Sequence, residues 1–350
     1  MRPEHVSILV CPRSGRPLAL GDRPVLEGSR VKEGVLIEPL SGASYLIRDF
    51  IPRFVTHEDY VASFGVEWTI HSRTQYDEHS GFSVSQERFE KETQWERDLR
   101  GEVILEVGSG SGRFTSNALK TGATVVSFDY SRAVEVNYRS NGSHENLLLV
   151  QASVYEMPFR LNYFDRAFCF GVLQHTPDPR EAFMSMVRHV KSGGKIAADV
   201  YAKSLRTWLL STKYWVRPFV DRSDPQTLYE TLKKYVNVMW PLARLLRKVP
   251  GVGLRLTSRL LIPDYSRLLP DADDATLKEW AYLDTFDMLS PIYDKPQTLK
   301  AFRRWFEEAG LREIDVRLSH QSRSMTVGRA MREPPTAPVR TPLQGVSASA

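Results

Sequence analysis

The chain has 350 residues, of which 42% are hydrophobic and 25% are charged, a balance typical of folded globular proteins. This composition excludes a fibrous, collagen-like or mostly disordered chain, and no apolar run approaches the ~20 residues that a membrane-spanning helix needs. The N-terminus lacks a signal-peptide stretch, and the two cysteines, Cys11 and Cys169, are too few for a disulfide framework. We therefore expect a cytoplasmic protein. The net charge of +5 is mildly basic, so its meaning depends on where the charge is located.

The first hundred residues predict two units that precede the main domain. Residues 1–56 contain short strand-like runs separated by Gly and Pro, which predicts a small β-rich unit. Residues 57–100 are polar and aromatic, and we expect a lid or linker: a loop followed by a helix over 85–99.

The next hundred residues, 101–201, alternate between apolar runs and helical patterns. Strands are predicted over 103–107, 124–128, 147–150, 165–170 and 195–201, with helices over 113–120, 132–139 and 179–190. Strands that alternate with helices at this spacing form a parallel sheet with both faces covered.

Residues 202–297 interrupt this alternation and predict a helical cap insertion. Within it, 202–280 hold 14 Lys and Arg against 8 Asp and Glu, so the positive charge of the chain is local. The core resumes over 298–330 with a helix over 298–309 and strands over 312–318 and 324–327, and the tail 331–350 is predicted to be disordered. The expected fold is thus α/β: a Rossmann-like, doubly wound, mostly parallel seven-stranded sheet.

The strongest chemical signal is the turn Gly108, Gly110 and Gly112, which follows a strand that carries Glu106 and precedes a helix. Glycines let a ligand lie against the backbone, and this turn falls at the carboxyl ends of the strands, where ligands bind. Asp129, at the end of the second strand, can accept hydrogen bonds from both hydroxyls of a ribose. A ligand with a ribose, a carboxylate and an amine but no phosphate suits these groups, and S-adenosylmethionine is such a molecule.

The region resembles a class I S-adenosylmethionine-dependent methyltransferase of the type 11 kind. The resemblance rests on segments 104–112, 128–131, 151–159, 164–179 and 190–194, in order and spacing. It implies S-adenosylmethionine as the cofactor, with the methionine moiety lined by Glu106, Gly108, Gly110 and Gly112. It also implies that Asp129 holds the ribose, Tyr130 flanks the adenine, Ser153 and Val154 sit beside the adenine edge, and Gly171 and Leu173 floor the site near the sulfonium. Many family members have Asp where this chain has Ser153.

The N-terminal unit resembles the zinc-ribbon-like domains that precede some of these methyltransferases, through segments 8–14 and 45–52. A zinc site needs several cysteines, and only Cys11 is present there. We therefore expect a degenerate ribbon without a metal, and no metal site elsewhere in the chain.

If the acceptor is a hydroxyl, methyl transfer needs a base. His175, just past the fourth strand, is the first candidate, and the alternative is that it only shapes the loop before Pro177. His71, Tyr76 and His79 are further candidates in the lid segment, unless they are surface aromatics packed on the sheet edge. Segments 64–68, 73–77 and 287–294 are similar to parts of one bacterial subgroup of the family, and the last either lines the acceptor pocket or is a plain linker.

The expected acceptor is a small or lipid-linked molecule of glycan, quinone or secondary-metabolite type. Apolar and basic residues alternate in 202–280, which suits a helix on an anionic membrane surface and hence a peripheral membrane location, but a helical cap with solvated basic residues would look the same. A nucleic-acid or protein methyltransferase is the rival enzyme. However, 173–176 lack the motif of amino-methylating nucleic-acid enzymes, so we do not expect nucleic acid as a partner. A non-catalytic binding module is the second rival.

Overall fold

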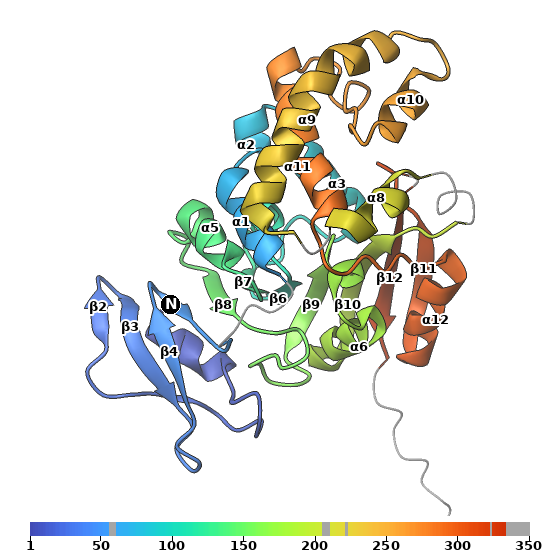
Figure 1. Cartoon of the computed structure of the whole chain (residues 1–350). Coiled ribbons are helices and arrows are strands. Elements are labelled where there is room, and N and C mark those ends of the chain that lie inside the picture. The colour runs from blue at the N-terminus through green and yellow to red at the C-terminus, as the bar shows by residue number, and fades with distance from the viewer. Residues whose placement is uncertain (56–60, 205–210, 221–222, 323, 334–350) are drawn as a thin grey trace, which may run out of the picture.

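The computed structural model describes residues 1–55, 61–204, 211–220, 223–322 and 324–333. Its centre is a seven-stranded sheet in the order β11-β12-β10-β9-β6-β7-β8 (Figure 1). The strands are β6 (Val103–Val107), β7 (Thr124–Asp129), β8 (Leu147–Gln151), β9 (Phe164–Cys169), β10 (Val190–Tyr201), β11 (Leu311–Leu318) and β12 (Met325–Arg332). Neighbours among β6 to β10 run parallel, whereas β12 runs antiparallel to both β10 and β11. The predicted Rossmann-like, mostly parallel sheet of seven strands is confirmed.

Helices cover both faces of this sheet because its strands are apolar on both sides. Leu105, Val126 and Leu148 belong to a core on one face, where α6 (Pro179–His189) and α12 (Leu299–Glu308) pack. Ile104 and Val125, one residue away, belong to the core on the opposite face. The helices on that second face are α3 (Val84–Thr93), α4 (Arg113–Leu119) and α5 (Ala133–Asn141). The alternation follows from the two-residue period of a strand.

Several predicted boundaries are wrong. The strand predicted over 195–201 is β10, which already begins at Val190, and the strand predicted over 324–327 is β12, which continues to Arg332. The helix expected over 85–99 is α3, which ends at Thr93 because Gln94 takes a left-handed conformation with φ 52° and the Thr93 hydroxyl accepts the Trp95 N–H. The predicted loop before it contains two helices, α1 (Ala62–Ile70) and α2 (Asp77–Ser80). The apolar residues of α1 do not fall on one face, and its packing against α5, α9 and α11 holds it instead. Of the tail expected to be disordered, 331–332 belong to β12, and 334–350 lie outside the described residues.

The N-terminal unit docks on the edge strand of the large sheet (Figure 1). It comprises a 3-10 helix (Pro3–Ile8) and strands β1 (Ala19–Leu20), β2 (Val25–Glu27), β3 (Arg30–Ile37), β4 (Ser44–Arg48) and β5 (Ile51–Pro52). Directly after β5, Arg53 forms an isolated parallel β-bridge with Gln151 of β8. The Phe54 N–H donates to the Gln151 carbonyl at 2.8 Å. Because this contact covers an otherwise open sheet edge, the unit shields β8 from pairing with other chains.

The cap insertion lies above the carboxyl ends of the strands (Figure 1). It contains α8 (Lys213–Val220), α9 (Pro225–Leu246), α10 (Gly253–Arg259) and α11 (Asp274–Leu289). A separate small core holds the cap together, with Trp240 of α9 and Trp280 of α11 among its buried members. Of the basic and apolar cap residues singled out in the sequence, Arg206, Trp208, Leu209 and Leu210 lie outside the described residues.

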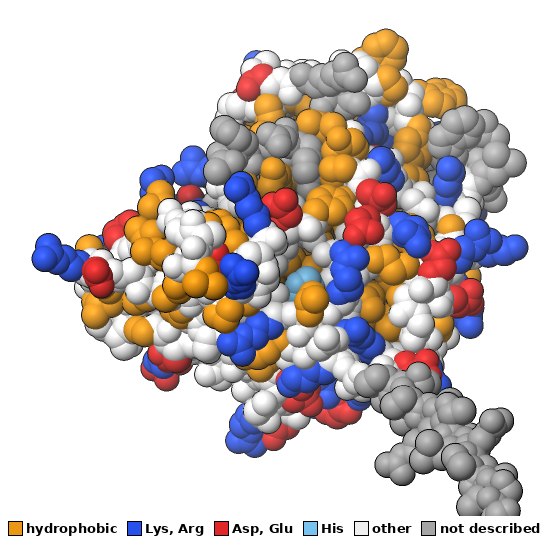
Figure 2. All heavy atoms as spheres, turned by 90° about the horizontal axis from the view of Figure 1, so that it is seen from below, with side chains coloured by type: hydrophobic (Ala, Val, Ile, Leu, Met, Phe, Trp, Pro, Cys, Tyr) orange, Lys and Arg blue, Asp and Glu red, His pale blue; other side chains and the backbone are white. Residues whose placement is uncertain are grey.

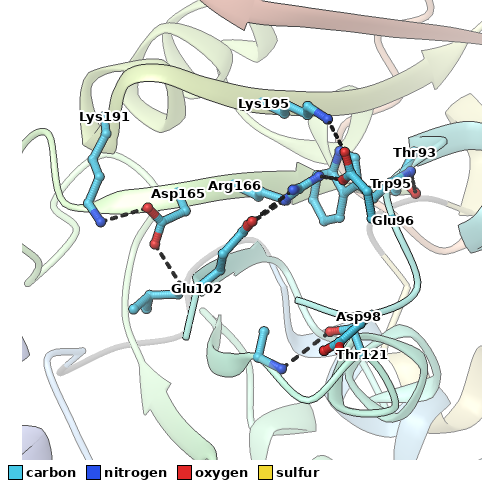
Figure 3. A network of polar contacts seen from close by, with 12 residues as sticks. Thr93, Trp95, Glu96, Asp98, Glu102, Thr121, Asp165, Arg166, Lys191 and Lys195 are labelled. Carbon is cyan, nitrogen blue, oxygen red and sulfur yellow. Dashed lines mark hydrogen bonds and ion pairs between the residues drawn. The ribbon is translucent and has the colours of Figure 1, made fainter. Parts of the chain in front are cut away.

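An ion-pair network joins the start of β9 to the segment before β6, at the end of the sheet away from the cap (Figure 3). The Arg166 guanidinium contacts Glu96 at 2.6 Å and Glu102 at 2.5 Å, and Lys195 also contacts Glu96, at 2.7 Å. The bond from Lys195 lowers the pKa of Glu96 to about 2. This network lies far from the ligand-binding end of the strands, so its role is structural.

Replacing Arg166 with Met should therefore lower the free energy of unfolding by about 2 kcal/mol, because two carboxylates lose a buried partner. Urea denaturation would measure the loss. The matched change Arg100→Met, at an exposed pair with Asp98, should leave stability nearly unchanged. Equal stability of both variants would contradict the structural role of the network.

Candidate active site

A cavity of about 760 Å³ lies between the carboxyl ends of the strands and the cap. Its volume is within the range of small-molecule sites in proteins. The sheet contributes the segments that follow β6, β7, β9 and β10, while the cap and α1 contribute the roof. Of the residues expected at a cofactor, Gly108, Gly110, Asp129, Tyr130, Val154 and Gly171 line this cavity, and so does His175.

The glycine turn needs its glycines for steric reasons. Gly108 has φ +78°, and a Cβ there would overlap the side chain of Val172. Gly110 has φ +51°, and a Cβ there would lie 3.1 Å from the indole nitrogen of Trp68 on α1. The backbone of the turn thus lies tightly between the segment that follows β9 and helix α1. A side chain on either glycine would disturb the cavity wall.

Asp129 is fixed at the end of β7 by hydrogen bonds to both of its oxygens. Oδ2 accepts the Gly110 N–H at 2.8 Å, and Oδ1 accepts the Ser131 N–H and hydroxyl at 2.8 and 2.7 Å. Burial raises the pKa of this carboxyl, while the Gly110 bond opposes that change. Asp129 therefore positions the glycine turn and presents a carboxylate to the cavity, since each oxygen can accept further hydrogen bonds.

Four residues expected at the cofactor do not line the cavity. Glu106 is 2% exposed, and its carboxylate accepts hydrogen bonds from Thr115 and from Ser127, so it braces the floor beneath the turn. Burial raises its pKa to about 8. Leu173 is fully buried in the core, Gly112 packs against Asn137 and Asn141, and the Ser153 hydroxyl accepts the Tyr155 N–H at 3.2 Å.

His175 is 5% exposed, and its ring lies between those of Phe64 and Tyr201, with centroids 5.3 and 5.2 Å away. Its Nδ1 lies 2.9 Å from the Tyr293 carbonyl, which can only accept, so Nδ1 carries the proton. Nε2 is left with a lone pair and has no hydrogen-bond partner among the described residues. Burial lowers the pKa of His175, which keeps the ring neutral at neutral pH.

The other three candidates lie outside the cavity, and of these His79 is exposed on α2. The His71 ring is held by Thr74 at 3.2 Å and by the Tyr229 hydroxyl at 2.9 Å, and burial lowers its pKa to about 4. The Tyr76 hydroxyl donates to the Ser111 carbonyl at 2.6 Å, which ties the lid segment to the glycine turn. Neither side chain is placed to touch an acceptor, because packing against the cap and the turn engages both polar ends.

The structure also brings residues to the cavity that the motifs did not point out. Glu67 and Trp68 of α1 line it, as do Asp284 and Asp287 of α11 and Tyr201 at the end of β10. For Glu67, Trp68 and Asp287 the segments 64–68 and 287–294 gave a signal in the sequence, whereas no motif pointed to Asp284 or Tyr201. That signal was a resemblance without a chemical role, because residue types alone do not show that two distant helices meet.

Residues 105–198 match the sequence pattern of a family described as "Methyltransferase domain". This segment is a methyltransferase domain. Together with the sheet order and the glycine turn, the match places it in class I, whose members use S-adenosylmethionine. The zinc-ribbon-like character of the N-terminal unit has no such support and stays a prediction.

Relatives match this domain only in part. Ubiquinone biosynthesis O-methyltransferase of Pseudomonas entomophila is 29% identical over 126 residues, which is 32% of this chain and 50% of that protein. An uncharacterized chloroplastic methyltransferase of Arabidopsis thaliana is 25% identical over 152 residues, 41% of this chain and 42% of that protein. The chain thus spans about half the length of the curated relatives it matches. Activity and substrate of the whole protein do not follow from them.

Solved structures show more distant likenesses. The CurJ carbon methyltransferase matches with TM-score 0.43 and 13% identity over 76% of this chain and 58% of that one. Human N-acetylserotonin methyltransferase bound to S-adenosylmethionine matches with TM-score 0.38 and 12% identity over 78% and 55%. Likenesses of this size decide nothing about activity.

The residues at the cavity fit S-adenosylmethionine. Gly171 has φ +76° with no atom within 4 Å of a would-be Cβ, so the floor is open where a ligand would lie. Asp129 keeps acceptor capacity at the end of β7, which suits ribose hydroxyls. Within the described part of the chain, no cluster of three or more His, Cys, Asp or Glu is arranged to hold a metal ion, and no helix is long and apolar enough to cross a membrane.

Proposed function

We propose that the chain is an S-adenosylmethionine-dependent methyltransferase that methylates a hydroxyl of a small or lipid-linked acceptor. The observation that carries this proposal is the enclosure of the glycine turn, Asp129 and His175 in one cavity. A cofactor cradle and a neutral imidazole with an unpartnered Nε2 are the two elements that such a transfer requires.

The cofactor, when bound, supplies an electrophilic methyl group on a positive sulfur. The side chains then have three tasks. Asp129 and the glycine turn bind and orient the nucleoside and the methionine part. The roof of α1 and the cap excludes water, and the His175 Nε2 accepts the proton from the acceptor hydroxyl. The relatives named as ubiquinone biosynthesis O-methyltransferases support a small molecule with a hydroxyl as the first class of acceptor to test.

Two measurements test this function directly. Calorimetry should show that the purified chain binds S-adenosylhomocysteine, and labelled S-adenosylmethionine should transfer its methyl group to hydroxyl-bearing small molecules. An absence of S-adenosylhomocysteine binding would remove the enzyme proposal. Binding without transfer to any acceptor would favour a non-catalytic module, and transfer to RNA or to protein would favour the rival enzyme class.

An exposed apolar stripe on the cap supports membrane contact as part of this function. Six side chains in α9, in α10 and in the segment that joins them are each at least 37% exposed: Val238, Leu242, Leu245, Val249, Val252 and Leu256. The first three are spaced by four and three residues on α9, so they share one face of that helix. Exposed basic residues flank the stripe at Arg244, Lys248, Arg255 and Arg259. On the opposite side of the molecule, seen from below, Lys and Arg are interspersed with acidic side chains (Figure 2). Exposed apolar and basic residues in one segment are complementary to an anionic membrane, and we propose such a membrane as the partner of the cap.

Replacing Leu245 with Glu should reduce sedimentation with anionic liposomes by about tenfold, because a charge enters the stripe where it would meet the headgroups. The control Leu161→Glu, at a similarly exposed leucine outside the cap, should bind liposomes like the unchanged chain. No retention of the unchanged chain at low salt would show that the basic cap is only a substrate lid.

A further inference from the structure

Three carboxyl groups from two helices meet at the roof of the cavity. Glu67 comes from α1, and Asp284 and Asp287 come from α11; all three line the cavity. Glu67 is fully buried, and neither of its oxygens has a hydrogen-bond partner among the described residues. A buried carboxyl without partners is costly, so its retention at a cavity wall calls for a ligand group that completes it.

The charges around this cluster do not balance within the described chain. Arg88 is engaged by Asp199, and Lys213 lies 2.6 Å from Asp294. Arg113 acts on both Glu67 and Asp284, and it also stacks on Phe114 with its guanidinium 4.6 Å from the ring centroid. Arg88 acts on Asp284 as well, but its guanidinium is already paired with Asp199. Arg267 lines another part of the cavity wall. Among the described residues, Arg113 is thus the only cation that acts on the pKa of Glu67.

The cluster lies toward the acceptor end of the site. Asp287 accepts a hydrogen bond from the Tyr201 hydroxyl at 2.9 Å, and the Tyr201 ring packs edge-on against His175. The cofactor end is marked by Asp129, whose oxygens are already engaged by Gly110 and Ser131. A group bound by the carboxyl cluster would thus sit near the side chain that we propose as the base.

We propose that Glu67, Asp284 and Asp287 bind a protonated amine of the acceptor, so that the substrate class is an amino alcohol, such as an amino sugar, rather than a neutral or acidic molecule. This proposal rests on the proposed methyl transfer in one respect, which is that the end of the cavity at Asp129 binds the cofactor. An ammonium group supplies both the missing positive charge and up to three hydrogen-bond donors. A neutral polyol would supply donors but leave the charge unbalanced.

The raised pKa values of two of these carboxyls agree with the absence of a paired cation beside them in the described part of the chain. Burial, followed by repulsion from Asp287, raises the pKa of Asp284 to about 8. The same causes raise the pKa of Glu67 well above its usual range. Bound ammonium would favour the ionised forms and reverse this shift.

The test uses the full chain saturated with S-adenosylhomocysteine and three matched probes in calorimetry: glucosamine, glucose and glucuronate. Glucosamine should bind about tenfold more tightly than either of the others, since only it carries an ammonium group. The variants Glu67→Gln and Asp284→Asn should each reduce this preference to under about threefold, while the dissociation constant of S-adenosylhomocysteine stays unchanged. Glu87→Gln, at an exposed pair with Lys91, is the control and should retain the preference.

The outcomes separate the two proposals. A chain that does not bind S-adenosylhomocysteine contradicts the proposed function. A chain that binds it but shows no preference for glucosamine, or keeps that preference in both cavity variants, overturns the amine site. Weaker S-adenosylhomocysteine binding in the Glu67→Gln variant would assign this carboxyl to the cofactor and also overturn it. Thermal unfolding checks the variants, and Glu67→Gln should not lower the melting temperature, because it removes a buried group that lacks partners.

Discussion

Replacement of His175 with Gln is expected to lower kcat by about 100-fold or more, with no change in the affinity for S-adenosylhomocysteine. Gln keeps a polar side chain of similar length but cannot accept a proton at neutral pH. The imidazole is positioned for this role by the Tyr293 carbonyl, which fixes the proton on Nδ1 and leaves Nε2 unprotonated. Steady-state rates with labelled S-adenosylmethionine, together with calorimetry on the same samples, measure the two effects.

The pH profile gives a second readout of the same residue. Burial lowers the pKa of His175 from its ordinary value, so the neutral form that acts as a base persists below pH ~6.5. The rate of the unchanged enzyme should therefore be flat at neutral pH and fall only at lower pH, as the ring gains a proton. The Gln variant should lack this acid limb. His79→Gln, at an exposed position on α2, serves as the control. A near-normal rate in the His175 variant would leave it the role of shaping the loop before Pro177.

Replacement of Asp129 with Ala is expected to weaken the binding of S-adenosylhomocysteine by more than tenfold. The change removes a carboxylate that can accept both ribose hydroxyls, and it also frees the Gly110 N–H that holds the glycine turn. The binding enthalpy should become less favourable, since charge-assisted hydrogen bonds are lost. Calorimetry at several concentrations of the nucleoside measures both quantities.

The variant Asp129→Asn separates these two roles. An amide oxygen can still accept the Gly110 N–H, but the amide nitrogen then faces the Ser131 N–H, and the charge toward the ribose is gone. We expect a loss of affinity smaller than in the Ala variant and a melting temperature somewhat below that of the unchanged chain. Asp98→Ala, at an exposed pair with Arg100, should not affect binding. An affinity within about threefold of normal in the Ala variant would show that the nucleoside is held elsewhere.

Local pattern was enough to predict the core of the domain. The strands β6, β7 and β8 are short apolar runs bounded by turns, and each lies where its pattern indicates. The glycine turn and Asp129 follow from the same reasoning, because a parallel sheet collects the carboxyl ends of its strands at one edge. His175 also lies at this edge, directly after β9. These residues meet by topology, which the order of strands and helices already contains.

Local pattern predicted the cap as a helical insertion, but it did not predict how the lid packs against the cap and the glycine turn. Helix α1 has no apolar face of its own and is held by α5, α9 and α11, which come from distant parts of the chain. His71 and Tyr76 have residue types suited to catalysis, yet their polar ends are engaged by Tyr229 and by the Ser111 backbone. Glu106 is close in sequence to the glycine turn, but its carboxylate turns under the floor to Thr115 and Ser127.

The amino-acid sequence by itself determined the sheet, the glycine turn and the position of Asp129, because these depend on alternation and spacing over a few residues. Only the tertiary structure decided which side chains form the roof of the cavity. Glu67 and Asp284 are more than two hundred positions apart, and they face one cavity because the cap folds back over the sheet. Contacts of that range depend on how whole helices pack, which no short pattern of residues specifies.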